Sequence, residues 1–259
     1  MILEGKTVVV SGVGPGLGRE IASAALRDGA NVLIGARTEN RLREIASELE
    51  PSGERIACQA TDISDSAQCE ALMRTAVTRF GGLDAVVQVA ALEAVFSTLE
   101  NTSVEDWRRS LDTNVIGNVQ LVRAAVPHLR ARGGGSVVLI GTQAMWLPQL
   151  AQISYASAKG ALLSAMYCMA KELGPDKIRV NMVVPTWMWG PPVQFYVKWQ
   201  ARERDVPEEE IVREITAGMP LGEIPADEDV AEAAIFLCSQ RARMITGQTL
   251  MVNAGELMR

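Results

Sequence analysis

Short runs rich in β-branched residues alternate with segments of helical periodicity from one end of the chain to the other. This alternation is typical of a parallel sheet, because each parallel strand needs a long crossover that is usually a helix. The expected strands are 7–11, 31–35, 55–60, 85–89, 136–140, 179–184 and 249–252. The expected helices are 17–28, 39–49, 64–80, 104–129, 155–173 and 226–239, with Ser64 and Thr102 or Ser103 as N-caps. The sequence predicts a doubly wound α/β fold with seven parallel strands and helices on both faces.

The length of 259 residues is one at which doubly wound proteins are routinely a single domain. Residues 1–259 are therefore expected to form one domain, with no internal repeat and no linker-like run. The alternation breaks between residues 186 and 224, where turns rich in Pro, Gly and Trp enclose a charged amphipathic stretch at 197–217. This stretch has no strand partner, so we expect an insertion that covers the substrate site as a lid.

Composition argues against several classes of function. The 31 Asp and Glu side chains outnumber 25 Lys and Arg, and the net charge of -6 has the wrong sign for binding nucleic acid or anionic lipid. The 4 cysteines are scattered and His128 is the 1 histidine, so no metal site is expected. The first residues lack a secretion signal, and no apolar run reaches the about 18 residues of a membrane span. We expect a cytoplasmic protein with no nucleic-acid or membrane partner.

A glycine-rich turn directly follows the first expected strand. It reads Ser-Gly-Val-Gly-Pro-Gly-Leu-Gly at 11–18, and a helix begins within it. Glycines let the backbone turn tightly and approach a ligand, and the N–H groups and dipole of the helix favour a pyrophosphate. In this strand–turn–helix context the sequence predicts a Rossmann-type dinucleotide site formed by Gly12, Gly16, Leu17 and Gly18. The alternative is a tight loop that only lets the helix pack on the sheet.

The end of the second strand indicates which dinucleotide is bound. An NAD-binding chain has an acidic residue there, roughly 20 residues beyond the turn, and this chain has Arg37 instead. A guanidinium pairs with the 2′-phosphate of NADP, so NADP(H) is favoured and NAD(H) is left open; Arg37 is otherwise a surface residue. After the third strand, Asp62 and Ile63 are expected to contact the cofactor, with the Asp62 carboxylate accepting from the adenine amino group. Asp62 is alternatively a helix-start residue.

Tyr155 and Lys159 are four residues apart in an expected helix, so they share one helix face. A free phenol has a pKa of about 10, and a neighbouring ammonium lowers it toward the range useful for proton transfer near neutrality. The pair also follows the fifth strand at the carboxyl edge of the sheet, where ligands bind in doubly wound folds. The alternative is a helix pair exposed to solvent, without a role in catalysis.

In their order along the chain, these motifs resemble those of the short-chain dehydrogenases/reductases, and the resemblance runs from Gly5 to Gly255. It rests on the glycine turn, on the Tyr155-x-x-x-Lys159 pair and on the segment that enters the last strand at Ile245. The resemblance implies hydride transfer between a nicotinamide and a carbonyl or carbinol carbon. Tyr155 would then be the general acid/base, and Lys159 would lower its pKa and bind the nicotinamide ribose. It also implies a homo-oligomer, either a tetramer or a dimer.

Other positions match this resemblance or depart from it. Asn114 matches a helix asparagine that holds a water in the family's proton relay. The family's catalytic serine is Thr142 here, which keeps a hydroxyl and adds a methyl group; the alternative is a strand-end threonine bonded to its own backbone. The family's Asn-Asn-Ala-Gly and Pro-Gly-x-x-x-Thr segments read Gln-Val-Ala-Ala at 88–91 and Pro-Thr-Trp-Met-Trp-Gly at 185–190. Residues still expected to line the cofactor there are Ala90, Pro185 and Met188.

The segments that frame the substrate in this family are apolar and aromatic in this chain. The expected substrate-binding residues are Trp146, Trp187, Trp189, Phe195 and Trp199. Large apolar side chains suit a hydrophobic secondary alcohol or ketone of alicyclic, terpenoid or steroid-like type; alternatively they plug a lid or a subunit interface. Family enoyl reductases separate the Tyr and Lys more widely, so this spacing favours carbonyl chemistry. Two other readings remain: an NAD-dependent dehydrogenase of the same family, and a dinucleotide-binding protein without turnover.

Overall fold

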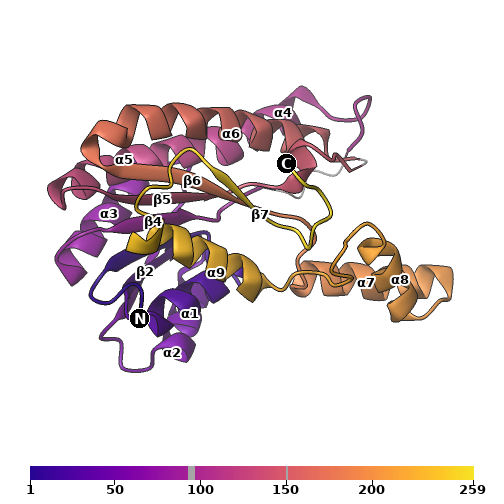
Figure 1. Cartoon of the computed structure of the whole chain (residues 1–259), viewed down its shortest axis with the longest axis horizontal. Coiled ribbons are helices and arrows are strands. Elements are labelled where there is room, and N and C mark those ends of the chain that lie inside the picture. Colours follow the sequence, from indigo (N-terminus) through magenta and orange to yellow (C-terminus); the bar gives the residue numbers. More distant parts are fainter. Residues whose placement is uncertain (93–96, 150) are drawn as a thin grey trace.

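The computed structural model describes residues 1–92, 97–149 and 151–259. Within these ranges seven strands form one parallel sheet in the order β3-β2-β1-β4-β5-β6-β7 (Figure 1). The strands are β1 (Thr7–Ser11), β2 (Asn31–Ala36), β3 (Ile56–Ala60), β4 (Ala85–Gln88), β5 (Gly135–Ile140), β6 (Ile178–Pro185) and β7 (Thr249–Val252). The predicted Rossmann-type fold is confirmed, and each predicted strand end lies within one residue of the observed one.

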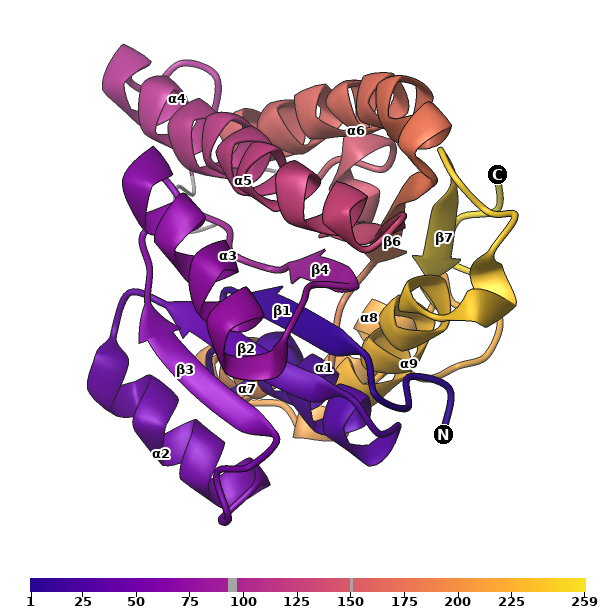
Figure 2. The ribbon, with the colours of Figure 1, turned by 90° about the vertical axis from the view of Figure 1, so that its left-hand side faces the viewer.

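Helices cover both faces of the sheet (Figure 2). One layer contains α1 (Leu17–Arg27), α2 (Glu39–Leu49) and α9 (Asp227–Cys238), and the other contains α3 (Ser66–Phe80), α5 (Asn118–Ala131) and α6 (Ile153–Leu173). Along β1, Val8 and Val10 pack into the core under α1 and α9, whereas Val9 packs into the opposite core. Because both faces are buried, the strands are continuous apolar runs without polar alternation.

One predicted helix cap was wrong and another is confirmed. The helix α3 begins at Ser66, and the Asp65 carboxylate caps it by accepting from Ala67 N at 2.9 Å and Gln68 N at 3.3 Å. Ser64 was predicted to be this cap, but its hydroxyl instead donates to the Asp62 carboxylate. The Ser103 side chain caps α4 (Val104–Leu111), as one of the two expected alternatives.

The long helix predicted over 104–129 is divided in the structure. After α4, residues Asp112–Gly117 form a π-helical turn, and α5 then begins at Asn118. The chain approaches its neighbours closely here, because a Cβ atom added at Gly117 would lie 2.8 Å from Ile63 Cγ1. Turns of this type widen an α-helix locally and are frequent at functional sites. Asn114 lies within this turn.

The insertion folds into two helices. The predicted single stretch at 197–217 is α7 (Pro191–Arg204) followed by α8 (Glu208–Thr216), because Asp205 adopts a left-handed conformation and ends α7. The hairpin projects from the body of the molecule (Figure 1) and has a small core of its own, made by Val197, Ala201 and Ile211. Its role as a lid over the substrate stays a prediction.

No helix in the described ranges is long and apolar enough to span a bilayer. Among the same residues, no group of three or more His, Cys, Asp or Glu side chains is arranged to hold a metal ion. The cysteines Cys58, Cys69, Cys168 and Cys238 are free thiols, and of these Cys69 and Cys238 are buried while Cys168 is exposed.

Asp84 ties the start of β4 to two other parts of the chain. Its carboxylate accepts from Thr7 N at 2.9 Å and from Lys6 Nζ at 3.1 Å, and Arg132 lies at 3.3 Å. Burial alone raises the pKa of Asp84, but these donors outweigh it, so the pKa is lowered below its ordinary value. A lowered native pKa means that the ionised group stabilises the fold above its unfolded pKa, and that this contribution is lost as pH falls through the native pKa.

We expect the Asp84→Asn variant to lose about 2 kcal/mol of unfolding free energy at pH 7, because the amide cannot pair with Lys6 and Arg132. Urea unfolding followed by circular dichroism measures this loss. Asp176→Asn is the matched control, since Asp176 pairs with Arg130 on the surface and should cost less than about 0.5 kcal/mol. The difference in unfolding free energy between wild type and Asp84→Asn should narrow as pH falls below the ordinary pKa of Asp84 toward its lowered native pKa, and a difference that stays constant would contradict this explanation.

Candidate functional site

The carboxyl ends of the parallel strands share one edge of the sheet. The chain builds the sheet outward from β1 in both directions, with β2 on one side and β4 on the other. A crevice forms at such a switch point, and ligands of doubly wound folds bind there. The glycine turn follows β1 and Ala90 follows β4, and Ser11 pairs with Gln88 at the ends of these two strands. The structure therefore brings these predicted residues to the crevice.

Close backbone contacts require glycine at two positions of the turn. Gly12 has a φ of 91°, and a Cβ atom added there would lie 2.1 Å from Ala90 N. A Cβ atom at Gly18 would lie 2.7 Å from Gly12 O, so the turn folds tightly onto itself. The helix α1 begins at Leu17 without a side-chain cap, which leaves its first N–H groups for a ligand. These residues fit the diphosphate of a dinucleotide.

Arg37 and Asp62 lie at the ends of the next two strands. Arg37 follows β2 and is exposed, as a side chain that receives a phosphate must be. Asp62 Oδ1 accepts from Ser64 N at 2.9 Å and from Ser64 Oγ at 2.7 Å. These hydrogen bonds, together with the positive charge of Arg37, lower the pKa of Asp62. Ile63 is buried in the core beside Gly117, so its side chain is not available to a cofactor.

Lys159 is a buried ammonium at the end of β5. Its side chain is only 2% exposed, and Nζ donates to Ile140 O over 2.7 Å. The same nitrogen lies 5.8 Å from the centroid of the Tyr155 ring. Tyr155 and Lys159 occupy the first two turns of α6, so the predicted pair shares a face at the carboxyl edge of the sheet. The structure thus places a fixed positive charge beside the phenol.

Two further predicted catalytic residues, Thr142 and Asn114, come from other segments of the chain than α6. Thr142 follows β5, and its Oγ1 accepts from Ala144 N at 3.3 Å, where it caps a short turn at Gln143–Met145. Accepting this bond leaves the hydroxyl hydrogen for another acceptor, so the backbone role and the predicted catalytic role are compatible. Asn114 is fully buried, and its amide accepts from Leu92 N at 2.9 Å and donates to Leu92 O at 2.8 Å. A role for Asn114 in a proton relay stays a prediction.

Known proteins resemble this chain in sequence and in fold. A family model described as Enoyl-(Acyl carrier protein) reductase matches residues 12–256. Dehydrogenase/reductase SDR family member 4 of Pongo abelii is 32% identical over 254 residues, covering 98% of this chain and 88% of the relative. L-fucose dehydrogenase of Oryctolagus cuniculus is 34% identical over 252 residues, covering 97% and 84%. The chain belongs to the short-chain dehydrogenases/reductases.

A solved structure agrees with this assignment. The L-sorbose reductase of Gluconobacter frateurii, complexed with NADPH and L-sorbose, superposes with a TM-score of 0.93 at 27% identity and covers 100% of both chains. As a short-chain dehydrogenase/reductase, this chain is an NAD(P)-dependent oxidoreductase.

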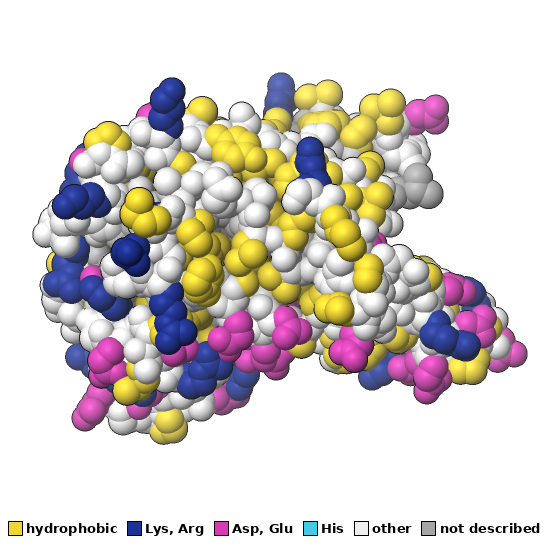
Figure 3. All heavy atoms as spheres, in the orientation of Figure 1, with side chains coloured by type: hydrophobic (Ala, Val, Ile, Leu, Met, Phe, Trp, Pro, Cys, Tyr) yellow, Lys and Arg dark blue, Asp and Glu magenta, His cyan; other side chains and the backbone are white. Residues whose placement is uncertain are grey.

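In this short-chain dehydrogenase/reductase the expected substrate residues do not all pack together. Tyr196 lies between Trp187 and Trp199, with its ring centroid 5.3 Å from that of Trp187 and 6.2 Å from that of Trp199. Trp146 is separate, and the Arg259 guanidinium lies 4.5 Å from its ring. Phe195 is 72% exposed on α7, so it does not share in this packing. The surface is hollowed between the α7–α8 hairpin and the body of the molecule (Figure 3).

A buried polar network joins the turns after three strands. Gln143 Oε1 accepts from Asn253 Nδ2 at 2.6 Å, and Gln143 Nε2 donates to Thr186 Oγ1 at 3.4 Å. The Thr186 hydroxyl in turn donates to Glu256. Sequence reasoning missed this network and Arg259, because the partners are up to 110 residues apart and no local spacing connects them. The network fixes the chain beyond β7 against the turns that carry Thr142 and Met188.

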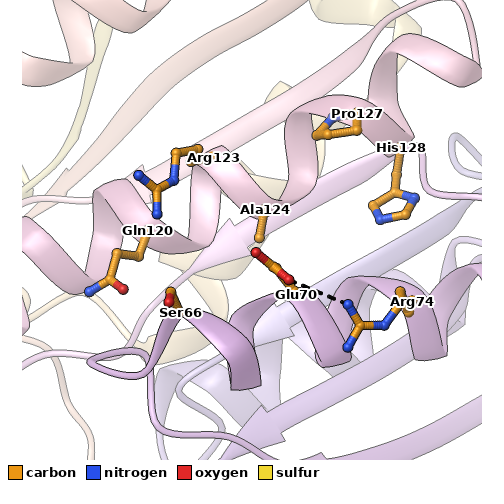
Figure 4. A pocket seen from close by; sticks show the side chains of 8 residues that line it. All are labelled: Ser66, Glu70, Arg74, Gln120, Arg123, Ala124, Pro127 and His128. Carbon is orange, nitrogen blue, oxygen red and sulfur yellow. Dashed lines mark hydrogen bonds and ion pairs between the residues drawn. The ribbon is translucent and has the colours of Figure 1, made fainter.

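Two surface depressions lie outside the predicted site. One of about 460 Å³ lies against the first turns of α6 on the face that carries Ala156 and Gly160, and neither Tyr155 nor Lys159 lines it. A groove of about 250 Å³ lies between α3 and α5 (Figure 4) and includes His128. In that groove the Glu70 carboxylate pairs with Arg74 at 3.5 Å. His128 stays outside the mechanism, as the sequence predicts.

Proposed function

We propose that this protein is an NADP(H)-preferring oxidoreductase that interconverts a secondary alcohol and a ketone on a hydrophobic substrate. The observation that carries the proposal is the buried Lys159 ammonium, held by Ile140 O at 2.7 Å beside Tyr155. A buried charge is costly to desolvate, and charged groups held in buried positions cluster at functional sites. Its position at the carboxyl edge, along the same edge as the glycine turn, favours a role in proton transfer at a dinucleotide site.

When bound, the nicotinamide cofactor supplies or accepts the hydride. Tyr155 is the general acid/base. Its phenol donates a proton to the substrate oxygen during ketone reduction, and its phenolate accepts the hydroxyl proton during alcohol oxidation. The Lys159 charge favours the phenolate form of Tyr155 and is suited to bind the nicotinamide ribose. The Thr142 hydroxyl donates to the substrate oxygen and so orients it, because the hydrogen bond that Oγ1 accepts from Ala144 N leaves the hydroxyl hydrogen available.

The cofactor residues divide along the strand edge. Gly12, Gly16, Leu17 and Gly18 would hold the diphosphate, and the exposed Arg37 would pair with the 2′-phosphate. The remaining contacts would come from Asp62 at the adenine and from the chain after β4 and β6 at Ala90, Pro185 and Met188. An NAD(H)-dependent enzyme is the alternative, which requires that Arg37 contributes nothing to binding.

The aromatic residues before and along α7 support a hydrophobic substrate of alicyclic, terpenoid or steroid-like type. Trp187, Tyr196 and Trp199 present contiguous apolar surface with few polar groups. Relatives named for L-fucose and L-sorbose make a polar polyol the competing substrate class. A panel of bulky apolar ketones, small polar carbonyls and ketoses, assayed with NADPH, separates the two classes. Faster turnover of the polar compounds would contradict the proposal.

Trp187→Ala is expected to raise KM for bulky apolar ketones about tenfold, because it removes a large contact that burial would stabilise. Steady-state rates with NADPH measure the change, and KM for a small ketone should stay constant. Trp107→Ala is the control of equal size, since Trp107 lies on α4 outside the aromatic groups. An equal rise in KM for small and bulky ketones would show that Trp187 only supports the fold.

We also propose that copies of the chain associate as a dimer or tetramer. β7 is an edge strand of the sheet, and the apolar side chains of Leu250 and Met244 are exposed on it and just before it. Exposed apolar surface along an edge strand favours contact with a second copy.

A further inference from the structure

Asp227, the first residue of α9, lies between the glycine turn and the chain that enters α7. A Cβ atom added at Gly16 would lie 3.1 Å from Asp227 Oδ2, and one added at Gly190 would lie 2.6 Å from the same oxygen. A backbone hydrogen bond of 2.8 Å from Trp189 N to Pro225 O joins the segments that lead into α7 and α9 (Figure 1). Asp227 Oδ2 therefore fills the space that a side chain at position 190 would use, directly beside the turn proposed to hold the diphosphate.

The Asp227 carboxyl group is buried without a compensating charge. Asp227 is 7% exposed, and its carboxyl group forms no hydrogen bond or ion pair with any residue in 1–92, 97–149 or 151–259. The charged groups that face it are acidic, namely Glu20 on α1 and Glu228 on α9, while Gly190 and Pro191 bring no charge from the turn before α7. Arg19 on α1 is already paired with Glu20 at 2.7 Å.

Burial, followed by the charges of Glu228 and Glu20, raises the pKa of Asp227. The N-terminus of α9 acts in the opposite direction, because the helix dipole favours a carboxylate there. A buried carboxyl group without a cationic partner is stabilised in its neutral form, in which it becomes a hydrogen-bond donor. Because Asp227 lies beside Gly16, this donor is directed to a ligand held by the glycine turn.

We propose that Asp227 is a cofactor-binding residue, and that its protonated carboxyl group donates a hydrogen bond to a diphosphate oxygen of the dinucleotide at the glycine turn. This inference rests on the proposed function. A carboxylic acid O–H is a strong donor to an anionic oxygen, whereas an ionised carboxylate in the same place would repel the diphosphate. Cofactor binding is therefore accompanied by the uptake of a proton on Asp227.

The sign of the pH dependence follows from this coupling. The negative diphosphate raises the pKa of Asp227 in the complex above its value in the free protein. Affinity is then highest below the pKa of the free protein and is lost as pH rises through the pKa of the complex. The diphosphate is common to NAD⁺ and NADP⁺, so both dinucleotides should show the same effect, whereas titration of the 2′-phosphate affects NADP⁺ alone.

Isothermal titration calorimetry with NAD⁺ and NADP⁺ between pH 4 and pH 8 tests the proposal. Wild-type affinity for each dinucleotide is expected to fall about tenfold as pH rises from the pKa of Asp227 in the free protein to its pKa in the complex, with proton uptake visible in buffers of different ionisation enthalpy. Asp227→Asn should abolish the uptake and flatten the profile, because an amide donates at every pH. Glu228→Gln removes one negative charge that raises the pKa of Asp227, so it should move the pH profile to lower pH while the proton uptake remains.

A second pair of variants tests the hydrogen bond itself. Asp227→Ala should bind NAD⁺ about tenfold more weakly at the acidic end of this range, because the donor is lost. Adding Gly190→Thr to this variant places a hydroxyl in the space that Asp227 vacates, and the backbone at Gly190, with φ −100° and ψ 179°, accepts any residue. The double variant should recover most of the affinity without the pH dependence.

Three results would overturn the inference. If the dinucleotide affinity of Asp227→Asn depended on pH as strongly as that of the wild type, protonation of Asp227 would not be part of binding. An Asp227→Ala variant that binds NAD⁺ as tightly as the wild type at the acidic end of the range would show that Asp227 donates no hydrogen bond to the cofactor. Absence of binding of either dinucleotide to the wild-type protein would overturn the proposed function, and this inference with it.

Discussion

Replacement of Tyr155 by phenylalanine is expected to lower kcat for ketone reduction about 10³-fold while cofactor affinity stays unchanged. The ring remains in place beside Lys159, and only the oxygen that donates or removes the substrate proton is lost. Steady-state kinetics with NADPH measure the first effect, and a fluorescence titration with NADPH measures the second. The combination separates a catalytic role from a structural one, because a misfolded site would lose cofactor binding as well.

Tyr167→Phe is the matched control for this experiment. Tyr167 lies on the same helix, α6, and is exposed to solvent, so the loss of its hydroxyl should leave kcat unchanged. Turnover by Tyr155→Phe at the wild-type rate would exclude the phenol as the acid/base. Binding of NADPH by the wild type without turnover of any alcohol or ketone would instead favour a dinucleotide-binding protein that is not an enzyme.

The Arg37→Ala variant is expected to bind NADPH about 30-fold more weakly and NADH equally well. The guanidinium is exposed at the end of β2, where it is free to meet a 2′-phosphate that NADH lacks. A 30-fold loss corresponds to about 2 kcal/mol, in the range for a charge-assisted contact to a phosphate. Titrations that follow reduced-nicotinamide fluorescence measure both dissociation constants.

Arg41→Ala is the control for charge, since Arg41 lies one turn into α2 and pairs with Glu44. It should change neither dissociation constant beyond the small effect of one surface charge. Equal loss of NADPH and NADH affinity in Arg37→Ala would place Arg37 away from the 2′-phosphate. Unchanged NADPH affinity would support the NAD-dependent alternative.

The fold was predictable because its signals are local. Buried parallel strands are short apolar runs, and helices between them repeat every 3.6 residues, so both patterns are visible within about ten residues. The exceptions have tertiary causes. The helix over 104–129 is divided at a π-helical turn because Asn114 is bonded to Leu92 and Gly117 meets Ile63. The cap of α3 is Asp65, since Ser64 is used by Asp62.

The candidate site was predictable to the extent that its residues follow strand ends. Gly12, Arg37, Thr142 and the Tyr155–Lys159 pair were all identified by position, because the carboxyl ends of parallel strands must meet at one edge. Burial was not predictable in the same way. Ile63 follows β3 as expected, yet its side chain belongs to the core, and Phe195 lies in the aromatic segment yet faces solvent.

The sequence by itself therefore determined the strand and helix order, the glycine turn and the spacing of Tyr155 and Lys159, because each depends on residues close together in the chain. Tertiary structure alone decided which distant side chains share a space. Asp227 lies against Gly16 across more than 200 residues, and Gln143 bonds to Asn253 across 110. Such contacts depend on how α9 and the chain after β7 pack on the sheet, and no local periodicity encodes that packing.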